Sequence, residues 1–277
     1  MDALFIIFSY VQLDDTLKAM GWRDHHHATL TSAEILTVAV TAAKYFHNHH
    51  ERALQVLYLT GYIPRLSVSR FNRRLHQTLK LLAELLDTLG CQRAEHKRMF
   101  AADTMPLPAC QRTYADHCRK IPQLKGYLGR CEAKKSWFCG WRLHWICDRQ
   151  GFPIAVDLVP AVWHELTTIQ HLMAHLNEGS IVWADGAYIG HDPQLLLLGS
   201  GLRLIAQPHQ RMKQQLTDAQ RAQMRVYRNA IETAHSVLER MGVQHLHAVT
   251  AAGFGIKVYT SLLALAFTVL LKESAIY

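Results

Sequence analysis

The chain has 277 residues, of which 49% are hydrophobic, and its formal net charge is +8 at pH 7. This composition excludes collagen-like, repetitive and disordered chains, and it suffices for one large core or for a core with a small second domain. The basic excess favours polyanionic partners, above all nucleic acid. Because the six cysteines form no Cys-x-x-Cys pair, we expect a reduced, intracellular protein.

Residues 1–95 predict helices throughout. No basic stretch precedes the apolar residues 4–8, which argues against a signal peptide. Thr31 and Glu34 form a capping-box pattern at the start of an apolar helical stripe. A second helix is predicted at 51–59. We therefore predict an all-helical N-terminal domain.

A third helix is predicted after the capping residue Ser67, with an apolar stripe that reaches Leu86. Its first turns carry Arg70, Arg73 and Arg74. Three short helices with a basic third one are typical of a helix-turn-helix-like DNA-binding domain. The alternative is an ordinary helical bundle with a solvated basic face, which the same spacing allows.

A polar stretch at 90–98 indicates a linker, and the sequence period then changes to that of strands. The apolar run 99–102 leads to Asp103. Pro106 and Pro108 follow, and we expect them to end the pairing of this strand because proline has no backbone N–H to donate.

The remaining sequence alternates between predicted strands and helices. Strands at 137–147 and 152–159 are predicted to form a hairpin across the turn 148–151. The later elements are helices at 164–176, 191–198 and 217–240, strands at 181–184 and 202–206, and a buried helix over the apolar segment 258–271. That last segment is shorter than the roughly 20 residues that span a bilayer. The order predicts an α/β fold at 96–277, with a mixed sheet flanked by helices.

Three acidic residues form the candidate site. Asp103 and Asp185 each end a short apolar strand, and Glu232 lies within the predicted helix at 217–240. Acids at the ends of buried strands are costly to desolvate unless they are paired or bind a cation. We therefore interpret the three as one metal-binding site. Carboxylate oxygens favour Mg²⁺ or Mn²⁺ over zinc.

Two basic segments flank these acids in sequence. Residues 111–150 carry nine Lys and Arg against three acids, and residues 203–228 carry six against one. A basic groove beside metal-binding acids is what DNA strand cleavage requires, whereas solvated charged faces are the alternative. The candidate DNA-binding side chains of these segments are Lys134, Lys135, Arg142, His144, Arg225 and Arg228. For His144, a paired position inside the sheet is the alternative.

The three acidic segments resemble the motifs of DDE transposases from small bacterial insertion sequences. The similar segments are Asp103-Thr-Met-Pro-Leu-Pro, Asp185-Gly-Ala-Tyr188 and Arg228-Asn-Ala-Ile-Glu232, together with Gly140–His144 and His247–Phe254. The resemblance extends over residues 30–260. Three motifs in this order, on a predicted strand, strand and helix, are far more specific than any one of them.

The resemblance implies an RNase H-like catalytic core with two divalent cations, usually Mg²⁺. Asp103 would bridge them, and Asp185 and Glu232 would each complete one. It also implies binding of double-stranded DNA at terminal inverted repeats and target sites, with strand cleavage and strand transfer. A homodimer or higher oligomer on DNA and a bacterial cytoplasmic, nucleoid-associated location are further expectations. The alternatives are a non-catalytic DNA-binding protein derived from a transposase and a hydrolase of small phosphate esters.

Two positions depart from the family pattern. Many relatives have Tyr three residues before the Arg of the third motif and Lys seven residues after its Glu, where this chain has Arg225 and Glu239. Glu239 is a rival for the third carboxylate, because residues i and i+7 share a helix face. Arg228 lies one turn before Glu232, and this spacing favours Glu232.

Overall fold

A computed structural model of the chain describes residues 1–121, 124–131, 135–163, 165–189, 199–209, 211–212 and 215–275. The chain forms two compact units. One contains Met1–Thr88 and Val237–Tyr277, and the other contains Leu89–Ser236. The last helix thus belongs to the unit of the N-terminal helices, whereas the sequence division grouped it with 96–277. That functional division stays a prediction.

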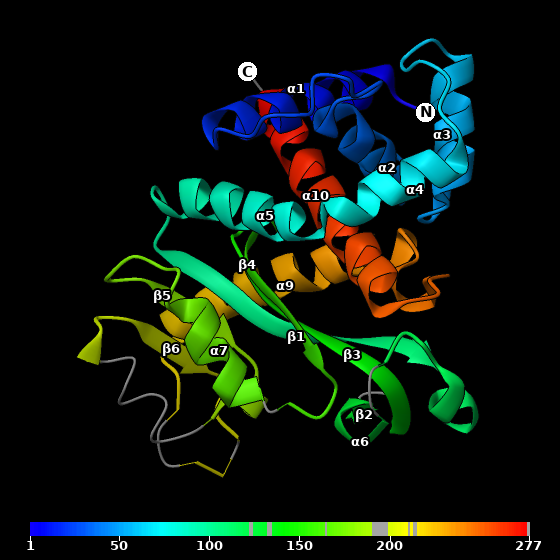
Figure 1. The fold of residues 1–277 in the computed structure, drawn as a ribbon. Helices are drawn as coiled ribbons and strands as arrows, with labels where there is room; N and C mark the ends of the chain where they lie inside the picture. Colours follow the sequence, from blue (N-terminus) through cyan, green and yellow to red (C-terminus); the bar gives the residue numbers. More distant parts are fainter. Residues whose placement is uncertain are drawn as a thin grey trace. The chain divides into compact units, whose positions relative to one another are not determined.

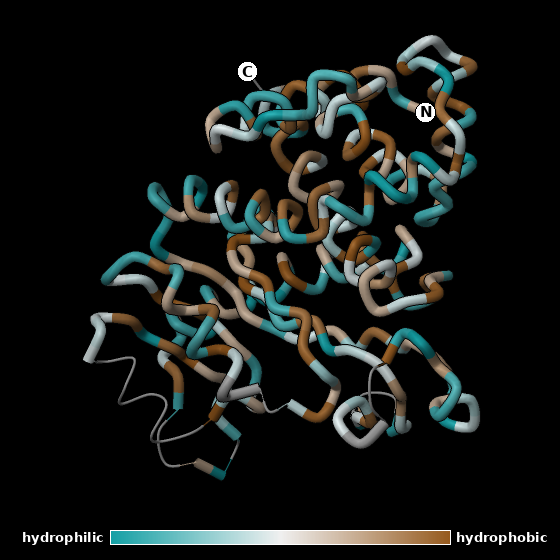
Figure 2. The backbone as a smooth tube through the Cα atoms, viewed as in Figure 1, coloured by the Kyte–Doolittle hydropathy of each residue, from teal (hydrophilic) through white to brown (hydrophobic). Residues whose placement is uncertain are grey.

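The first unit is helical (Figure 1). Apolar and polar residues alternate along its helices (Figure 2), as expected for helices that bury one face. The capping box predicted at Thr31 is present, since Thr31 and Glu34 each accept a hydrogen bond from the other's backbone N–H. The helices are α1 (Ala3–Ala19), α2 (Ser32–Phe46), α3 (His50–Leu59), α4 (Val68–Gln77), the first part of α5 (Leu79–Ala94), the short 3₁₀ helix η3 (Val243–His245) and α10 (Ala251–Ser274).

The predicted third helix is two helices, because α4 ends at Gln77 and α5 begins at Leu79. Between them, the buried Thr78 hydroxyl donates a hydrogen bond to the carbonyl oxygen of Leu75 at 2.7 Å. Such local bonds compete with the regular helix. The apolar stripe continues through the break, so periodicity alone did not reveal it.

α10 is the core helix of the first unit. It packs against α1 and α2, and most of its side chains from Phe254 to Val269 are buried. The predicted buried helix is confirmed, but it has 24 residues and is long and apolar enough to cross a membrane by length and composition, with 72% of that window buried. The Thr260 and Ser261 hydroxyls donate to carbonyl oxygens one turn earlier at 2.9 and 2.8 Å. These two hydroxyl donors are therefore paired although they are buried.

The second unit holds a mixed sheet, six-stranded over the described residues (Figure 1). Its strands are β1 (Met99–Cys110), β2 (Leu128–Cys131), β3 (Ser136–Cys147), β4 (Pro153–Pro160), β5 (Ile181–Ala184) and β6 (Arg203–Ala206). The order is β2-β3-β1-β5-β6, and β4 also pairs with β3. β1, β5 and β6 are parallel, and the pairs that involve β3 are antiparallel.

Over the described residues, short helical elements and two longer helices accompany the sheet in the second unit. They are η1 (Arg112–His117), α6 (Leu124–Tyr127), α7 (Glu165–Met173), η2 (Gly186–Tyr188) and α9 (Asp218–Arg240), the last of which continues into the first unit. α7 packs on β3 and β4. The predicted mixed sheet flanked by helices is confirmed. The helix predicted at 191–198 lies outside the described residues.

β1 continues through both prolines, so the expectation that they end its pairing is wrong. Pro106 pairs with Arg142 and Pro108 with Gly140 in the antiparallel ladder with β3. On its other edge, β1 pairs with β5 only from Met99 to Ala101 in the described part of the chain. The prolines are two residues apart, so their nitrogens point to the same edge. Proline fits there because no strand among the described residues pairs with that part of the edge, so no N–H donor is needed.

The predicted hairpin turn between β3 and β4 is present. The Asp148 N–H donates to the Phe152 carbonyl at 3.1 Å, and the Gly151 N–H donates to the Asp148 carbonyl at 3.0 Å. Gly151 has φ +79°, which glycine adopts at little cost. α5 continues to Ala94, so the first half of the predicted linker at 90–98 is helix.

Gly90 of α5 lies directly against β4. A side-chain carbon here would lie 1.9 Å from the carbonyl oxygen of Ile154. We expect Gly90→Ala to lower the free energy of unfolding by about 1–3 kcal/mol, because overpacking forces the backbone apart. Gly126→Ala is the matched control, since nothing lies within 4 Å of the added carbon. Urea unfolding compares the two, and equal stability would contradict the close packing of α5 on β4.

Candidate active site

Asp103 lies on β1, and Asp185 directly follows the neighbouring parallel strand β5. β1 and β5 pair from Met99 with Ile181 to Ala101 with Trp183. The same register, continued by two residues, places Asp185 opposite Asp103. Neighbouring strands lie about 4.8 Å apart, and both aspartates are half-buried. The carboxyl ends of parallel strands are where ligand sites form in open α/β sheets.

Backbone donors orient both aspartates. The Asp103 Oδ1 accepts a hydrogen bond from the Thr104 N–H at 2.7 Å. Asp185 precedes η2, and its Oδ1 accepts from the Ala187 N–H at 2.9 Å. A side chain at Gly186 would approach the Gln207 carbonyl oxygen within 3.2 Å. The segment that follows β6 therefore lies beside the residue after Asp185.

Glu232 lies on α9, in the same unit as the two aspartates. Its side chain is 57% exposed and lies 3.4 Å from the Arg228 Nη2. His235 follows it by three residues, and its Nδ1 lies 3.7 Å from the Asp103 Oδ2. Residues three apart on a helix are neighbours on its surface. Glu232 therefore lies on the same side of α9 as His235, the residue that contacts Asp103.

The rival acid Glu239 lies about 10 Å further along α9. Its Oε1 accepts a hydrogen bond from the Gln244 Nε2 at 2.7 Å. Glu232 belongs to the same compact unit as the two aspartates, whereas Glu239 belongs to the other unit. In the conformation described, no three His, Cys, Asp or Glu side chains among the described residues are close enough to hold a metal ion.

A basic groove of about 410 Å³ adjoins Glu232. Its arginines are spaced so that one face of α9 carries them all. Arg228 also donates a hydrogen bond through Nη1 to the Gln207 Oε1, which ties the helix to the segment after β6. The lining residues that carry charge or amide groups are Gln207, Gln215, Arg221, Arg225, Arg228, Asn229 and Glu232.

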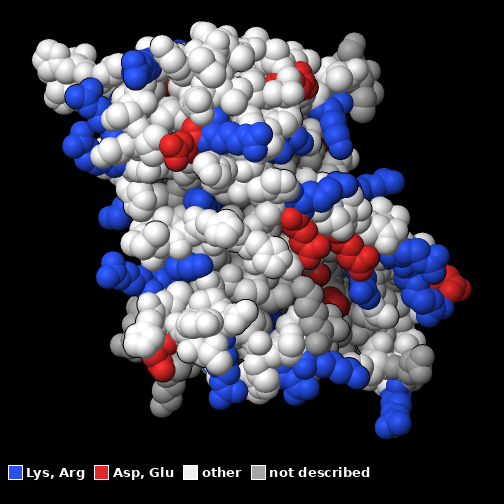
Figure 3. Space-filling view, turned by 90° about the vertical axis from the view of Figure 1, so that its right-hand side faces the viewer, with Lys and Arg blue, Asp and Glu red and all other residues white. Residues whose placement is uncertain are grey.

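Two other predicted DNA contacts of this unit lie at or near its surface, Arg142 half-buried and Lys135 exposed. The Arg142 Nη2 donates to the Arg130 carbonyl at 3.0 Å, and its guanidinium lies 6.0 Å from the centre of the Phe138 ring. Lys135 is exposed. Lys134 lies outside the described residues. On the face in Figure 3, basic side chains are widely spread, and acidic ones gather in smaller groups.

His144 is a correction to the predicted DNA contacts. It is 1% exposed, on β3 between Thr104 of β1 and Asp157 of β4. Burial lowers the pKa of His144 to about 4. Neither ring nitrogen has a hydrogen-bond partner among the described residues. No DNA strand can reach this side chain in the folded sheet, so its place is in the core.

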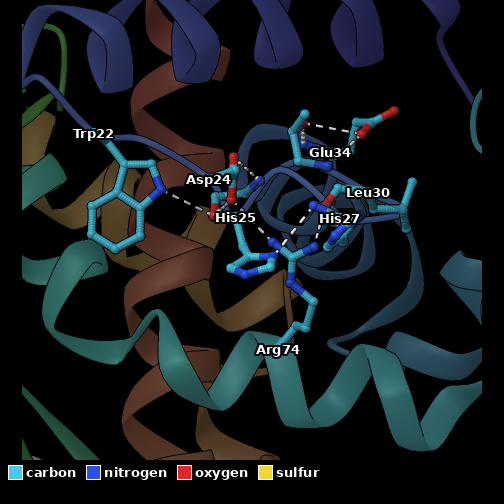
Figure 4. A network of polar contacts seen from close by, with 9 residues as sticks. Trp22, Asp24, His25, His27, Leu30, Glu34 and Arg74 are labelled. Carbon is cyan, nitrogen blue, oxygen red and sulfur yellow. Dashed lines mark hydrogen bonds and ion pairs between the residues drawn. The ribbon is translucent and has the colours of Figure 1, made fainter.

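In the first unit, α4 carries the three predicted arginines in different settings. Arg70 and Arg73 are exposed. Arg74 is directed inward: its Nη2 donates to the Asp24 Oδ1 at 3.0 Å, and its Nη1 donates to the Leu30 carbonyl (Figure 4). Arg74 therefore anchors the loop between α1 and α2, and its guanidinium is already engaged.

Sequence reasoning missed His235 and its contact with Trp145. The Trp145 Nε1–H donates to the His235 Nε2 at 2.8 Å, and Trp145 is fully buried. Trp145 pairs directly with Asp103 in the ladder of β1 and β3. The only sequence signal for His235 is its position three residues after Glu232. Trp145 lies opposite Asp103 because of the pairing register of β1 and β3, and local sequence patterns do not give this register.

Comparison with known proteins gives two kinds of match. The family model described as a transposase DDE domain matches residues 93–248. Among solved structures, a piggyBac transposase synaptic complex with hairpin DNA is similar with a TM-score of 0.51 and 10% sequence identity, over 98% of this chain and 74% of that chain. At this identity, the likeness concerns the fold alone.

A Mos1 transposase paired-end complex with the left transposon end matches more weakly. Its TM-score is 0.25 and its sequence identity 13%, over 79% of this chain and 82% of that chain. No curated protein sequence matches the chain significantly.

Proposed function

The chain belongs to the family of transposase DDE domains, and we propose that it binds the terminal inverted repeats of an insertion sequence, cuts DNA at the element ends and joins those ends to target DNA. The observation that supports the proposal is the parallel register of β1 and β5, which would set Asp185 opposite Asp103 if continued by two residues, together with the position of Glu232 on α9 beside an arginine-lined groove. Acids and arginines together suit a reaction on a phosphodiester.

The acids fit hard divalent cations. Asp103, Asp185 and Glu232 offer only carboxylate oxygens, which suit Mg²⁺ or Mn²⁺ rather than zinc. We propose that they hold two such ions. When bound, the ions would supply Lewis-acid stabilisation of the charge that develops on the phosphodiester oxygens. The backbone donors at Thr104 and Ala187 orient the two aspartates beforehand, so less ordering remains when cations and DNA bind.

The groove beside Glu232 provides a path for a DNA strand. Arg225 and Arg228 line the groove from one face of α9, whereas Arg221 on the same face already pairs with Asp218. Guanidinium binds phosphate oxygens with two parallel hydrogen bonds. Holding the backbone here aligns a scissile phosphate with the acids, first for hydrolysis and then for attack by a DNA 3′-hydroxyl. Gln207 keeps Arg228 extended between Glu232 and the β6 side of the groove.

We further propose that the helical residues 1–95 recognise element ends, with the exposed Arg70 and Arg73 on α4 as DNA contacts, and that 96–277 is the catalytic domain. Two element ends must be brought together for transfer, so we propose a homodimer or higher oligomer on double-stranded DNA. The piggyBac structure that shares this fold is a synaptic complex with DNA. We place the protein in the bacterial cytoplasm, associated with the nucleoid.

Neutralising the groove is expected to weaken DNA binding without changing its sequence preference. Arg225→Ala and Arg228→Ala each remove one phosphate contact, so each should reduce the slope of log K against log salt by about 1. The matched control is Arg203→Ala, an exposed arginine of β6 outside the groove. Fluorescence anisotropy on end DNA at several salt concentrations measures the slopes. An unchanged slope in both groove variants would remove this face of α9 from the DNA path.

The whole proposal is tested by purified protein, candidate end DNA and Mg²⁺. We expect strand-specific nicks at the element end that disappear when a chelator removes the cation. Binding of the same DNA without nicks, with Mg²⁺ or with Mn²⁺, would instead identify a non-catalytic DNA-binding protein derived from a transposase.

A further inference from the structure

Three side chains from three separate elements, Trp145, His235 and Asp103, lie in contact with one another. Trp145 of β3 is fully buried and donates its indole N–H to the His235 Nε2 at 2.8 Å. The two rings also lie against each other, with centres 5.4 Å apart. On its other side, His235 turns Nδ1 toward the Asp103 Oδ2, 3.7 Å away. Asp103 is the residue opposite Trp145 in the ladder.

This geometry fixes the tautomer of His235. An indole N–H can only donate, so the His235 Nε2 must accept and carries no hydrogen. The neutral ring then carries its single hydrogen on Nδ1, which faces Asp103. A charged ring would set two N–H donors against each other at 2.8 Å.

We infer that His235 is a positioning residue, which holds the Asp103 carboxylate with its Nδ1–H, and that Trp145 sets the tautomer this requires. Since Nδ1 carries a hydrogen, His235 does not serve as a metal ligand. At 3.7 Å the contact is electrostatic rather than a hydrogen bond. Thr104 holds the other oxygen of the same carboxylate.

The position of His235 on α9 gives the contact a second effect. His235 follows Glu232 by three residues, so the same contact that orients Asp103 also fixes the helix that carries Glu232. Nearby, a side-chain carbon at Gly151 would lie 3.1 Å from the Ala234 Cβ, which shows how closely α9 packs on the β3–β4 turn. The consequence for catalysis rests on the proposed function, whereas the tautomer does not.

The tautomer is measured directly on the full-length, metal-free protein. With ¹⁵N-labelled histidine, long-range ¹H–¹⁵N spectra distinguish a ring protonated on Nδ1 from one protonated on Nε2, and His235→Asn assigns the signal. We expect His235 to be protonated on Nδ1, and Trp145→Phe to remove this preference. An Nε2-protonated His235 in the wild-type protein would overturn the inference, whatever the protein does to DNA.

A matched pair of amide variants tests the role in the reaction. His235→Asn places an amide N–H near the Nδ1 position, and His235→Gln places it near Nε2, so only the former directs an N–H toward the Asp103 carboxylate. We expect the Mg²⁺ concentration for half-maximal nicking to rise at least tenfold in His235→Gln and to stay within threefold of wild type in His235→Asn. DNA affinity should be unchanged in both.

Equal metal dependence in the two amide variants would show that His235 only fills space, and would overturn the positioning role. Thermal unfolding of both variants establishes that they are folded. If the wild-type protein does not nick DNA at all, the proposed function fails while the tautomer measurement still decides the inference about His235 and Trp145.

Discussion

Asp103→Asn is expected to abolish DNA cleavage while leaving the affinity for end DNA nearly unchanged. Asparagine keeps the size of the side chain, and its carbonyl oxygen can still accept the Thr104 N–H. It lacks the negative charge that would hold a divalent cation. Losing even an outer partner of a metal ligand costs about 10–100-fold, so we expect the nicking rate to fall by more than about 100-fold.

The assay is strand-specific nicking of end DNA with Mg²⁺, with binding measured in parallel. Asp185→Asn and Glu232→Gln should behave like Asp103→Asn. The matched control is Asp15→Asn, which removes an exposed carboxylate from α1 and should cut normally. Wild-type nicking by Asp103→Asn would refute the assignment of the three acids.

Arg93→Ala is expected to destabilise the second unit by about 3–5 kcal/mol, because it leaves a buried charge without its partner. The Asp148 side chain is 1% exposed, and its Oδ2 accepts from the Arg93 Nε and Nη2, both at 2.8 Å. Its Oδ1 accepts from the Gln150 and Phe152 N–H groups at 2.9 and 3.0 Å. The ion pair therefore joins α5 to the β3–β4 turn.

The double variant Arg93→Ala/Asp148→Asn separates charge from packing. Asparagine keeps an acceptor for the turn but removes the unpaired charge, so the double variant should regain part of the stability lost in Arg93→Ala. Urea unfolding at constant pH measures each variant. Additive losses in the double variant would show that the guanidinium acts mainly through its contact with the Phe152 ring, 5.2 Å from its centre.

Features encoded within a few residues could be predicted from the sequence. The capping box at Thr31, the turn at Asp148–Gly151 and the short strand before Asp185 depend on neighbours in the chain. The mixed sheet followed from the order of such elements. Asp103 and Asp185 could be singled out because each follows an apolar run whose burial makes a carboxylate costly.

Features that depend on distant contacts could not be predicted. The prolines of β1 are tolerated because β5 is short, and the burial of His144 follows from strands on both sides of β3. Arg74 is directed inward because Asp24, fifty residues earlier, also accepts from the Ser32 N–H and hydroxyl. Periodicity predicts that a residue lies on a helix, but it does not predict which distant residue its side chain contacts.

Among the described residues, β1 pairs with no strand beyond Ala101 on the edge that faces β5, and this has a consequence for contacts between molecules. A bare edge normally offers a template on which a strand from a neighbouring molecule can assemble, and that route leads to aggregation. Pro106 and Pro108 withhold the amide donors at alternate positions of this edge. A strand added along this stretch would therefore lack donors from β1 at both proline positions, so it could not form a complete ladder.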